Sequence, residues 1–163
     1  MDPFKNIIKF TPIGIIRTPF KQAAGMPIQP SGAKGVKGTI EIEAEFIGGL
    51  KDLNGFSHII LIYHLHQSKN YQLEVIPFLD SVKRGVFATR APNRPNPIGL
   101  SIVKLLKIES NILHIENVDI LDQTPLIDIK PYVPEFDKPS AVKTGWLEKK
   151  KGSVIFKKSD DRF

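Results

Sequence analysis

The 163-residue sequence contains no cysteine. This absence excludes disulfide bonds, thiolate nucleophiles and cysteine-ligated metal sites. A chain without disulfides is typical of a reducing compartment, and we expect a cytoplasmic protein.

Long apolar segments are also missing. The opening residues, MDPFKNIIKFTPIG, place Lys and Asp among short apolar runs and do not resemble a signal peptide. Elsewhere no apolar stretch approaches the roughly 20 residues of a membrane-spanning helix. We expect no association with a membrane.

The glycine motifs that bind nucleotides in α/β proteins are missing too. Gly32, Gly35 and Gly38 are each three positions apart, which forms neither G-x-G-x-x-G nor a P-loop. Strand-like segments do not alternate with long helices, which argues against a doubly wound nucleotide-binding sheet. Any nucleotide cofactor would therefore be bound on a mostly β scaffold.

Positive charge is in modest excess. The chain has 23 Lys and Arg against 17 Asp and Glu, a formal net charge of +6, and a pI of about 9.5. This favours an anionic partner such as RNA, although a role in solubility explains a modest excess equally well. With 41% apolar residues the chain can build one hydrophobic core. We expect one domain over residues 1–148 and a lysine-rich, partly frayed tail over residues 149–163.

Alternation of apolar and polar residues is the dominant pattern. Residues 39–46, TIEIEAEF, place their apolar side chains on one face, as in a half-buried strand. Further strands are predicted at residues 59–65, 73–79, 85–89, 100–108, 112–121 and 126–133, with one short helix at residues 47–53. Short strands joined by polar or Gly/Pro turns predict a mainly β fold, either a barrel or a sandwich.

A stiff, cationic loop interrupts this pattern. The segment RGVFATRAPNRPNPIGLS holds three prolines, which fix their own φ angles and extend the residues before them. The segment can form neither a helix nor a central strand. Its backbone is already rigid, so its polar side chains would lose little conformational entropy when a ligand binds. Arg90 and Arg94 suit recognition of phosphate or carboxylate groups, unless one of them pairs with a local aspartate.

The histidines suggest ligand contacts rather than a metal. His58, His64 and His66 are predicted on one face of a strand, but no carboxylate or cysteine accompanies them, so we predict no metal site. His66 and Gln67, at the predicted strand end, can hydrogen-bond the edges and hydroxyls of a nucleoside.

The carboxylates in DILDQTPLIDIKPY have two interpretations each. Asp122 either caps its own turn or belongs to a site, and Asp119 lies in a predicted strand, where Asp is depleted. Asp128, Lys130 and Tyr132 share one face of the next strand, which is either a polar site or a wet outer surface.

These motifs together resemble the TrmO (TsaA/YaeB-like) family. The segments GVFATRAPNRPNPIGLS and DILDQTPLIDIKPYVP carry the resemblance, with IGIIRTPFK and FSHIILIYHLHQ before them in the usual order. The resemblance implies a small single-domain β-barrel of mostly antiparallel strands with one or two short helices. It also implies a homodimeric, S-adenosylmethionine-dependent tRNA methyltransferase that methylates N6 of threonylcarbamoyl-adenosine beside the anticodon.

The resemblance assigns the cofactor to four segments. Its contacts would come from an early loop, a strand end, the proline loop and the DILDQ turn: Gln29, Pro30, Ser31, His66, Gln67, Arg90, Leu100, Ile120, Leu121, Asp122 and Gln123. Gln123 stands where the family usually has glycine, which would alter the turn that contacts the cofactor. The C-terminal domain typical of bacterial members has no counterpart in this sequence, so RNA would bind the barrel and its basic surface.

For catalysis we expect Asp122 or His66 to accept the proton of the acceptor nitrogen, with Lys130 and Tyr132 orienting the acceptor. Arg84, Arg94, Lys149 and Lys150 are the expected RNA contacts. We expect tRNA binding to fall steeply with salt, and removal of the tail from Lys149 onward to lower this salt dependence while leaving cofactor affinity unchanged. The alternative function is a non-catalytic β-barrel that binds RNA or a nucleotide.

Overall fold

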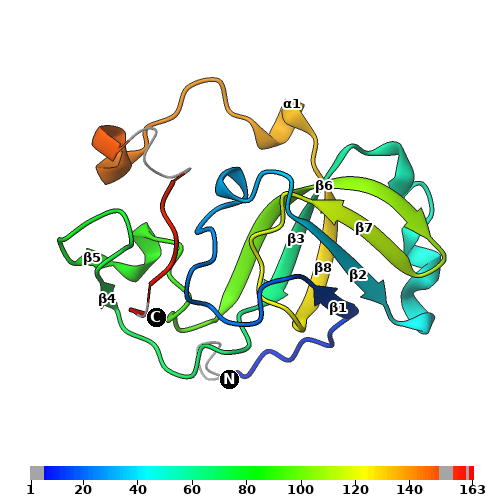
Figure 1. The fold of residues 1–163 in the computed structure, drawn as a ribbon, viewed down its shortest axis with the longest axis horizontal. Coiled ribbons are helices and arrows are strands. Elements are labelled where there is room, and N and C mark those ends of the chain that lie inside the picture. The colour runs from blue at the N-terminus through cyan, green and yellow to red at the C-terminus, as the bar shows by residue number, and fades with distance from the viewer. Residues whose placement is uncertain (1–5, 151–155, 161) are drawn as a thin grey trace.

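The computed structural model describes residues 6–150, 156–160 and 162–163. Its main feature is a closed barrel of six strands, each antiparallel to both neighbours, in the order β1-β2-β7-β6-β3-β8 (Figure 1). The strands are β1 (Gly14–Arg17), β2 (Lys37–Ile42), β3 (His58–His64), β6 (Ile98–Glu109), β7 (Ile112–Glu116) and β8 (Thr124–Pro131). The prediction of a mainly β, antiparallel barrel is confirmed, and the sandwich is excluded.

Short elements occupy the connections. A two-stranded sheet pairs β4 (Glu74–Val75) with β5 (Arg84–Gly85). In the part of the chain that the structure describes, the helical segments are five 3-10 helices and one turn of α-helix: η2 (Pro30–Gly32), η3 (Ala44–Leu50), η4 (Leu53–Gly55), η5 (Val86–Ala88), η6 (Gly145–Lys150) and α1 (Pro134–Asp137).

Alternation within the strands builds the barrel core. In β3, Ile59, Leu61 and Tyr63 are buried, and in β6 every second residue from Gly99 to Leu105 is buried. This follows from the two-residue period of a strand, which turns successive side chains to opposite faces. The core also includes Ile16, Ile40, Ile42, Val103, Leu113, Ile115, Val118, Ile120 and Leu126.

Antiparallel pairing gathers the long connections at one end of the barrel, on the left in Figure 1. β1 and β3 end there, and β6 and β8 begin there, as the pairs Ile16↔Thr124 and His64↔Ile98 show. The connections over residues 18–36, 65–97 and 117–123 therefore leave from this end, which we call the loop end. Sites are commonly built from such connections on a rigid scaffold.

Several predicted element bounds are wrong. The strand predicted at residues 39–46 ends at Ile42, and η3 begins at Ala44. The predicted helix at residues 47–53 is interrupted at Asp52, whose φ of 66° is left-handed. Of the strand predicted at residues 73–79 only Glu74 and Val75 are in a strand, and of the strand predicted at residues 85–89 only Gly85 is. β7 stops at Glu116 because Asn117, with φ of 65°, turns the chain, so Asp119 lies in a loop rather than in a strand.

The described residues of the tail are packed on the loop end. Ser159 forms two backbone hydrogen bonds, from its N–H to Met26 O at 2.8 Å and from Gly25 N–H to its carbonyl at 3.0 Å. The Phe163 ring meets Phe78 edge-on, with 5.1 Å between centroids. Ser159 and Phe163 therefore contact the loop end, whereas Phe156 is 85% exposed. The prediction of a partly frayed tail also covers residues 151–155 and 161, which lie outside the described residues. The predicted boundary after residue 148 falls inside η6.

Candidate active site

Three adjoining depressions at the loop end share the residues Ile28 and Arg90. The first, which we call the inner cleft, has a volume of about 260 Å³ and is lined by residues that include Met26, Tyr63, Leu65, His66, Gln67, Phe78, Asn93, Asp119, Leu121 and Phe163. The second, the β6 cleft, has a volume of about 350 Å³ and includes Gln29, Arg94, Asn96, Gly99, Leu100 and Asp119. The third is an aromatic groove of about 910 Å³. Its lining includes Gln29, Pro30, Ser31, Phe78, Phe87, Ala88, Thr89, Ile102, Trp146, Leu147 and Phe163.

A chain of three polar side chains connects the barrel interior to the inner cleft. Ser101 Oγ donates a 2.7 Å hydrogen bond to Asp119 Oδ1. The Ser101 oxygen lies 3.0 Å from the Tyr63 hydroxyl, which donates because the Ser101 proton is already used. Burial raises the pKa of Asp119 to about 6, against the hydrogen bond from Ser101 and the charge of Arg90, which lower it. At neutral pH most Asp119 side chains are thus ionised and can accept a proton.

The Tyr63 hydroxyl stays protonated. Burial first, and the charge of Asp119 second, raise its pKa well above the ordinary value for tyrosine. The Tyr63 ring also lies against Gly99 on the paired strand, so a side chain at Gly99 would collide with it. The network is therefore held in place by backbone packing as well as by hydrogen bonds.

Arg90 stands where the three depressions meet. Its Nη1 donates a 3.2 Å hydrogen bond to Gln29 Oε1, and its residue surface is exposed. The proline loop behind it is fixed by internal hydrogen bonds, because Ser68 Oγ donates to Pro92 O at 3.0 Å and Arg94 Nη1 reaches Thr89 O at 3.3 Å. The prediction of a stiff loop presenting Arg90 is in keeping with this geometry, whereas Arg94 bonds its own loop.

His66 faces the inner cleft from just beyond β3. Strand β3 ends at His64, and the His66 N–H turns back to bond the His64 carbonyl at 2.8 Å, so the two do not share a strand face as predicted. His66 Nδ1 lies 3.4 Å from Thr124 Oγ1, which itself donates to Leu121 O at 2.6 Å. Partial burial, and then the neighbouring His64, lower the pKa of His66, so its ring is uncharged at neutral pH.

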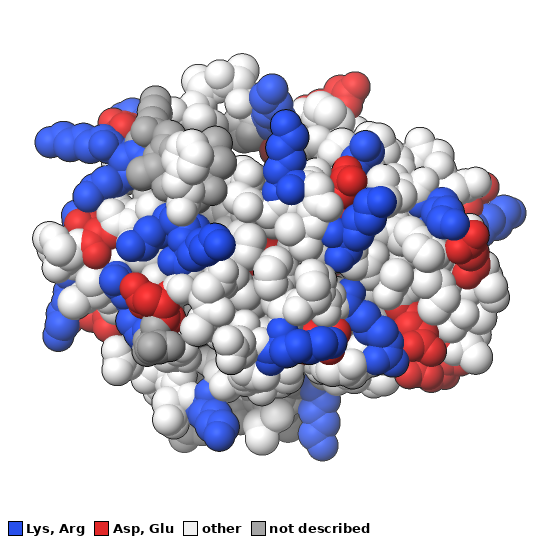
Figure 2. Space-filling view, in the orientation of Figure 1, with Lys and Arg blue, Asp and Glu red and all other residues white. Residues whose placement is uncertain are grey.

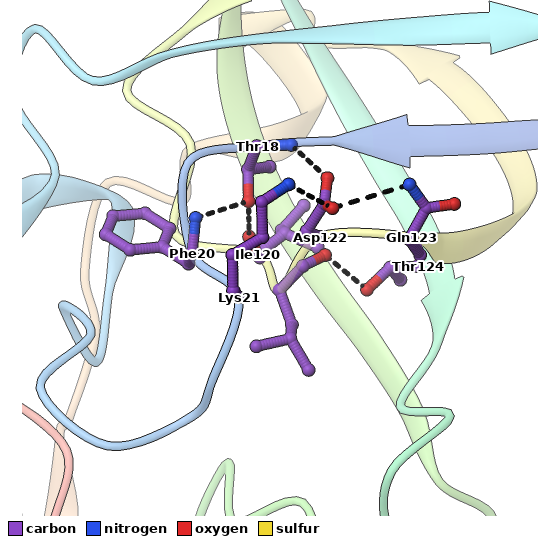
Figure 3. Close-up of polar contacts among 8 residues, drawn as sticks. Thr18, Phe20, Lys21, Ile120, Asp122, Gln123 and Thr124 are labelled. Carbon is purple, nitrogen blue, oxygen red and sulfur yellow. Dashed lines mark hydrogen bonds and ion pairs between the residues drawn. The ribbon is translucent and has the colours of Figure 1, made fainter.

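Asp122 has a different environment, shown in Figure 3. Its carboxylate accepts hydrogen bonds from Thr18 N–H at 2.9 Å, Lys21 Nζ at 2.5 Å and Gln123 Nε2 at 3.4 Å. Burial acts to raise the pKa of Asp122, but these hydrogen bonds outweigh it and lower the pKa. Asp122 and Gln123 line a separate groove with Arg17 and Lys21. Through its hydrogen bonds, Asp122 links the segment that follows β1 to the 117–123 connection.

The backbone at Gln123 has the left-handed conformation that glycine favours. Its φ of 63° is left-handed, the conformation that glycine adopts without strain. The replacement of the usual family glycine therefore leaves the backbone of this turn in a glycine-like shape.

Lys130 and Tyr132 lie at the opposite end of the barrel from His66. Tyr132 N–H bonds His58 O at 3.2 Å, at the start of β3, and the two rings meet at 6.4 Å. Lys130 forms an ion pair with Asp128 at 2.9 Å. Tyr132 is eight positions after Thr124, which is about 26 Å of extended chain. The structure does not bring these two residues to the inner cleft.

The residues expected to bind the cofactor divide among the depressions. His66, Gln67, Arg90, Ile120 and Leu121 line the inner cleft. Two more, Gln29 and Leu100, line the β6 cleft with Arg90, while Pro30 and Ser31 line the aromatic groove. Only Asp122 and Gln123 line none of the three.

Two of the residues expected to contact RNA, Arg84 and Lys150, pair with the same acidic side chain. Arg84 donates to Asp80 Oδ2 through Nε at 3.0 Å and Nη2 at 2.8 Å, and its guanidinium lies 5.5 Å from the Trp146 ring centre. Lys150 approaches the same Asp80 at 3.8 Å. Hydrogen bonds from Arg84 lower the pKa of Asp80, which therefore stays ionised and neutralises part of this charge.

Some residues of the clefts could not be assigned from the sequence. Asp119 carried a signal, because Asp is depleted in strands and residues 112–121 are predicted as one, but its role depends on Ser101 and Tyr63, which look like ordinary strand residues. The tail residue Phe163 carried no signal.

Within residues 6–150, 156–160 and 162–163, no group of three or more acidic or His side chains could hold a metal ion. In the same part of the chain, no helix has the length and apolar character to cross a membrane.

Fold and site together define a class: a small antiparallel barrel with a nucleoside-sized, partly apolar cleft built from the connections at one end. Residues 15–138 match the family model described as the tRNA-methyltransferase O N-terminal domain. The chain therefore belongs to the TrmO family.

The most similar relatives include proteins named for a cofactor and proteins named for an activity. A probable S-adenosyl-L-methionine-binding protein of Pyrococcus abyssi is 55% identical over 96% of this chain and 85% of its own. An S-adenosyl-L-methionine-binding protein of Archaeoglobus fulgidus is 41% identical over 77% of this chain and 90% of its own. The mouse tRNA (adenine(37)-N6)-methyltransferase is 38% identical over 78% of this chain.

Solved structures agree with the barrel. A crystal structure of TrmO from Pseudomonas aeruginosa matches with a TM-score of 0.72 and 37% identity, covering 86% of this chain. The present chain spans 63% of that TrmO and 31% of the mouse enzyme.

Proposed function

We propose that this protein is an S-adenosylmethionine-dependent tRNA methyltransferase that acts on N6 of the adenosine beside the anticodon. Relatives named for S-adenosyl-L-methionine binding and for tRNA (adenine(37)-N6) methylation support the cofactor and the reaction. The finer proposal is that the acceptor adenosine carries a threonylcarbamoyl group, whose electron withdrawal eases loss of the N6 proton. A tRNA substrate is also the reason to propose a cytoplasmic location.

One observation supports this proposal most directly: Asp119 and Arg90 both line the inner cleft and the β6 cleft. The cofactor has an apolar adenosine, ribose hydroxyls and a charged amino acid end. Tyr63, Leu65 and Phe78 provide an apolar wall, and Gln67 offers an amide at the inner cleft. Arg90 can bind a carboxylate through its guanidinium. The donor set therefore fits S-adenosylmethionine.

Asp119 is the group that we propose accepts the N6 proton. When bound, S-adenosylmethionine supplies a methyl group activated by its sulfonium. A base must be deprotonated before it can act, and the pKa of about 6 leaves Asp119 mostly ionised at neutral pH while keeping it more basic than an ordinary aspartate. Ser101 holds the carboxylate in position. Asp122 is less suited, because Lys21 and Thr18 already occupy both of its oxygens.

His66 is the second candidate for the base. Its lowered pKa leaves an uncharged ring at neutral pH, and it lines the same cleft. The variants Asp119→Asn and His66→Gln separate the two, because loss of a general base lowers turnover by about 10²–10⁴-fold. If the rate of methyl transfer to tRNA is lost in Asp119→Asn and largely kept in His66→Gln, the base is Asp119. The reverse result assigns the base to His66.

The function is tested by binding and by turnover. Calorimetric titration with S-adenosylmethionine in the absence of RNA, followed by methyl transfer to tRNA, is expected to give both signals. Saturating cofactor at about 100 times its Kd adds about 2.7 kcal/mol to the free energy of unfolding. Binding of tRNA without any cofactor binding or turnover would instead support the non-catalytic alternative.

We further propose a homodimer whose active sites lie near the subunit contact. Three apolar side chains of β6 face outward in a row, with Ile98 40%, Leu100 47% and Ile102 37% exposed. An isologous contact over Ile98 and Leu100 would bury both side chains and would enclose the β6 cleft, which both line. Light scattering at micromolar concentration is expected to give twice the monomer mass. A fully active monomer would contradict the proposal.

A further inference from the structure

Most of the aromatic groove is not accounted for by a cofactor in the inner and β6 clefts, because among the expected cofactor contacts only Gln29, Pro30, Ser31 and Arg90 line it. It is the largest of the three depressions, and aromatic rings line it from η5, from η6 and from the tail. Phe87 of η5 is 76% exposed, although phenylalanine is usually buried. Within the described chain, Phe87 has no ring contact with another aromatic side chain.

The aromatic rings of the groove differ in whether other side chains already contact them. Trp146 is engaged, because its Nε1–H donates to Ala88 O at 2.9 Å and the Arg84 guanidinium covers its ring at 5.5 Å. Phe78 is contacted by Phe163 and by Arg162. Phe163 in turn contacts Phe78 and packs against the buried cluster around Val86. Among the described rings of the groove, Phe87 is therefore the one that is mostly exposed and has no aromatic or cationic partner.

Positively charged side chains border the groove. Arg90 lines the groove, and Lys149 is exposed at the end of η6, next to the groove residues Trp146 and Leu147. Figure 2 shows Lys and Arg side chains spread over the face of the molecule that includes the loop end. An exposed ring in a groove bordered by cations fits an unpaired nucleobase with its phosphates, because bases stack on aromatic side chains while the backbone follows positive charge.

We propose that an unpaired base of single-stranded RNA stacks on Phe87 in the aromatic groove, with its phosphates towards Arg90 and Lys149. This inference rests on the proposed function, because the RNA would be the anticodon loop of tRNA. Arg90 borders both the groove and the clefts, so a base on Phe87 would be a near neighbour of the base that enters the inner cleft. Phe87 would then fix the register of the loop.

The test measures the affinity of an anticodon stem-loop RNA by fluorescence anisotropy over a series of salt concentrations. Phe87→Ala is expected to raise Kd by about 5- to 150-fold, the effect of one lost base stack, and Phe87→Trp to restore it. The dependence of log Kd on log salt is expected to stay unchanged, because no phosphate contact is lost. The matched control is Phe136→Ala in α1, since Phe136 is also 76% exposed and lies outside the groove.

Four outcomes would overturn the inference. Equal affinity of Phe87→Ala and the parent chain would mean that no base stacks there. A change in the light-scattering mass of Phe87→Ala would assign the groove to a second copy of the chain. An equal loss of affinity for fully double-stranded RNA would show that no unpaired base is involved. If the parent chain binds S-adenosylmethionine but no RNA, the proposed tRNA substrate fails as well.

Discussion

The Ser101 hydroxyl donates a 2.7 Å hydrogen bond to the carboxylate of Asp119, and this bond holds a titratable group at the wall of the inner cleft. The folded protein raises the pKa of Asp119 from 3.8 to about 6, so it binds a proton that the unfolded chain releases over this range. The free energy of unfolding therefore falls as pH rises from about 4 to about 6.

Replacement of Asp119 by the isosteric Asn removes this pH dependence. As pH rises from 4 to 7, the free energy of unfolding of Asp119→Asn is expected to increase relative to that of the parent chain by up to about 3 kcal/mol. The reason is that the variant no longer has to bury a charge. Urea unfolding at several pH values measures the difference. Parallel stability curves for the two proteins would show that Asp119 titrates normally.

Arg90→Ala tests whether the proline loop serves the ligand. Arg90 is exposed and has one hydrogen bond, to Gln29, so stability should change by only about 0.5 kcal/mol. Loss of a charged hydrogen-bond donor should raise the Kd for S-adenosylmethionine roughly 10- to 100-fold. Arg17→Ala, which breaks an ion pair with Glu41 on the barrel wall, is the control and should leave this Kd unchanged. An unfolded Arg90→Ala chain whose folded fraction binds normally would make Arg90 structural.

Gly99→Ala tests the packing that positions Tyr63. A Cβ at Gly99 would lie 2.2 Å from Tyr63 Cε2 and 2.5 Å from Cζ, so the ring or β6 must move. Overpacking of this kind lowers the free energy of unfolding by about 1–3 kcal/mol. Gly49→Ala, with no atom within 4 Å of the added Cβ, should not be destabilised. Equal thermal stability of the two variants would argue against the close approach.

Phe163→Ala tests the contribution of the tail to the site. Phe163 lines the inner cleft and packs against the buried cluster of Val75, Val86 and Ala91. We expect roughly tenfold weaker binding of S-adenosylmethionine, contrary to the sequence-based expectation that the tail is independent of the cofactor. Phe156→Ala, at a position 85% exposed, is the control. Unchanged cofactor affinity in Phe163→Ala and in a chain ending at Lys150 would restore the original expectation.

Local patterns in the sequence predicted the barrel and its stiff loop. Alternation over β3 and β6 indicated which side chains face the core, because a strand turns successive residues to opposite faces. The prolines of the 84–101 segment indicated a loop that could hold Arg90, because they restrict the backbone without help from any partner. The same local reasoning failed at Ile42 and Glu116, where the chain leaves the barrel although the alternation continues.

Tertiary structure decided which of these residues meet. Alternation assigns a face but not an end of the barrel, so it could not show that Lys130 and Tyr132 lie far from His66. Asp122 pairs with Lys21 across 101 positions, and the tail reaches the inner cleft, because packing at the loop end joins segments that are distant in sequence. The raised pKa of Asp119 likewise comes from burial and from neighbours on other segments, and a sequence carries no local record of either.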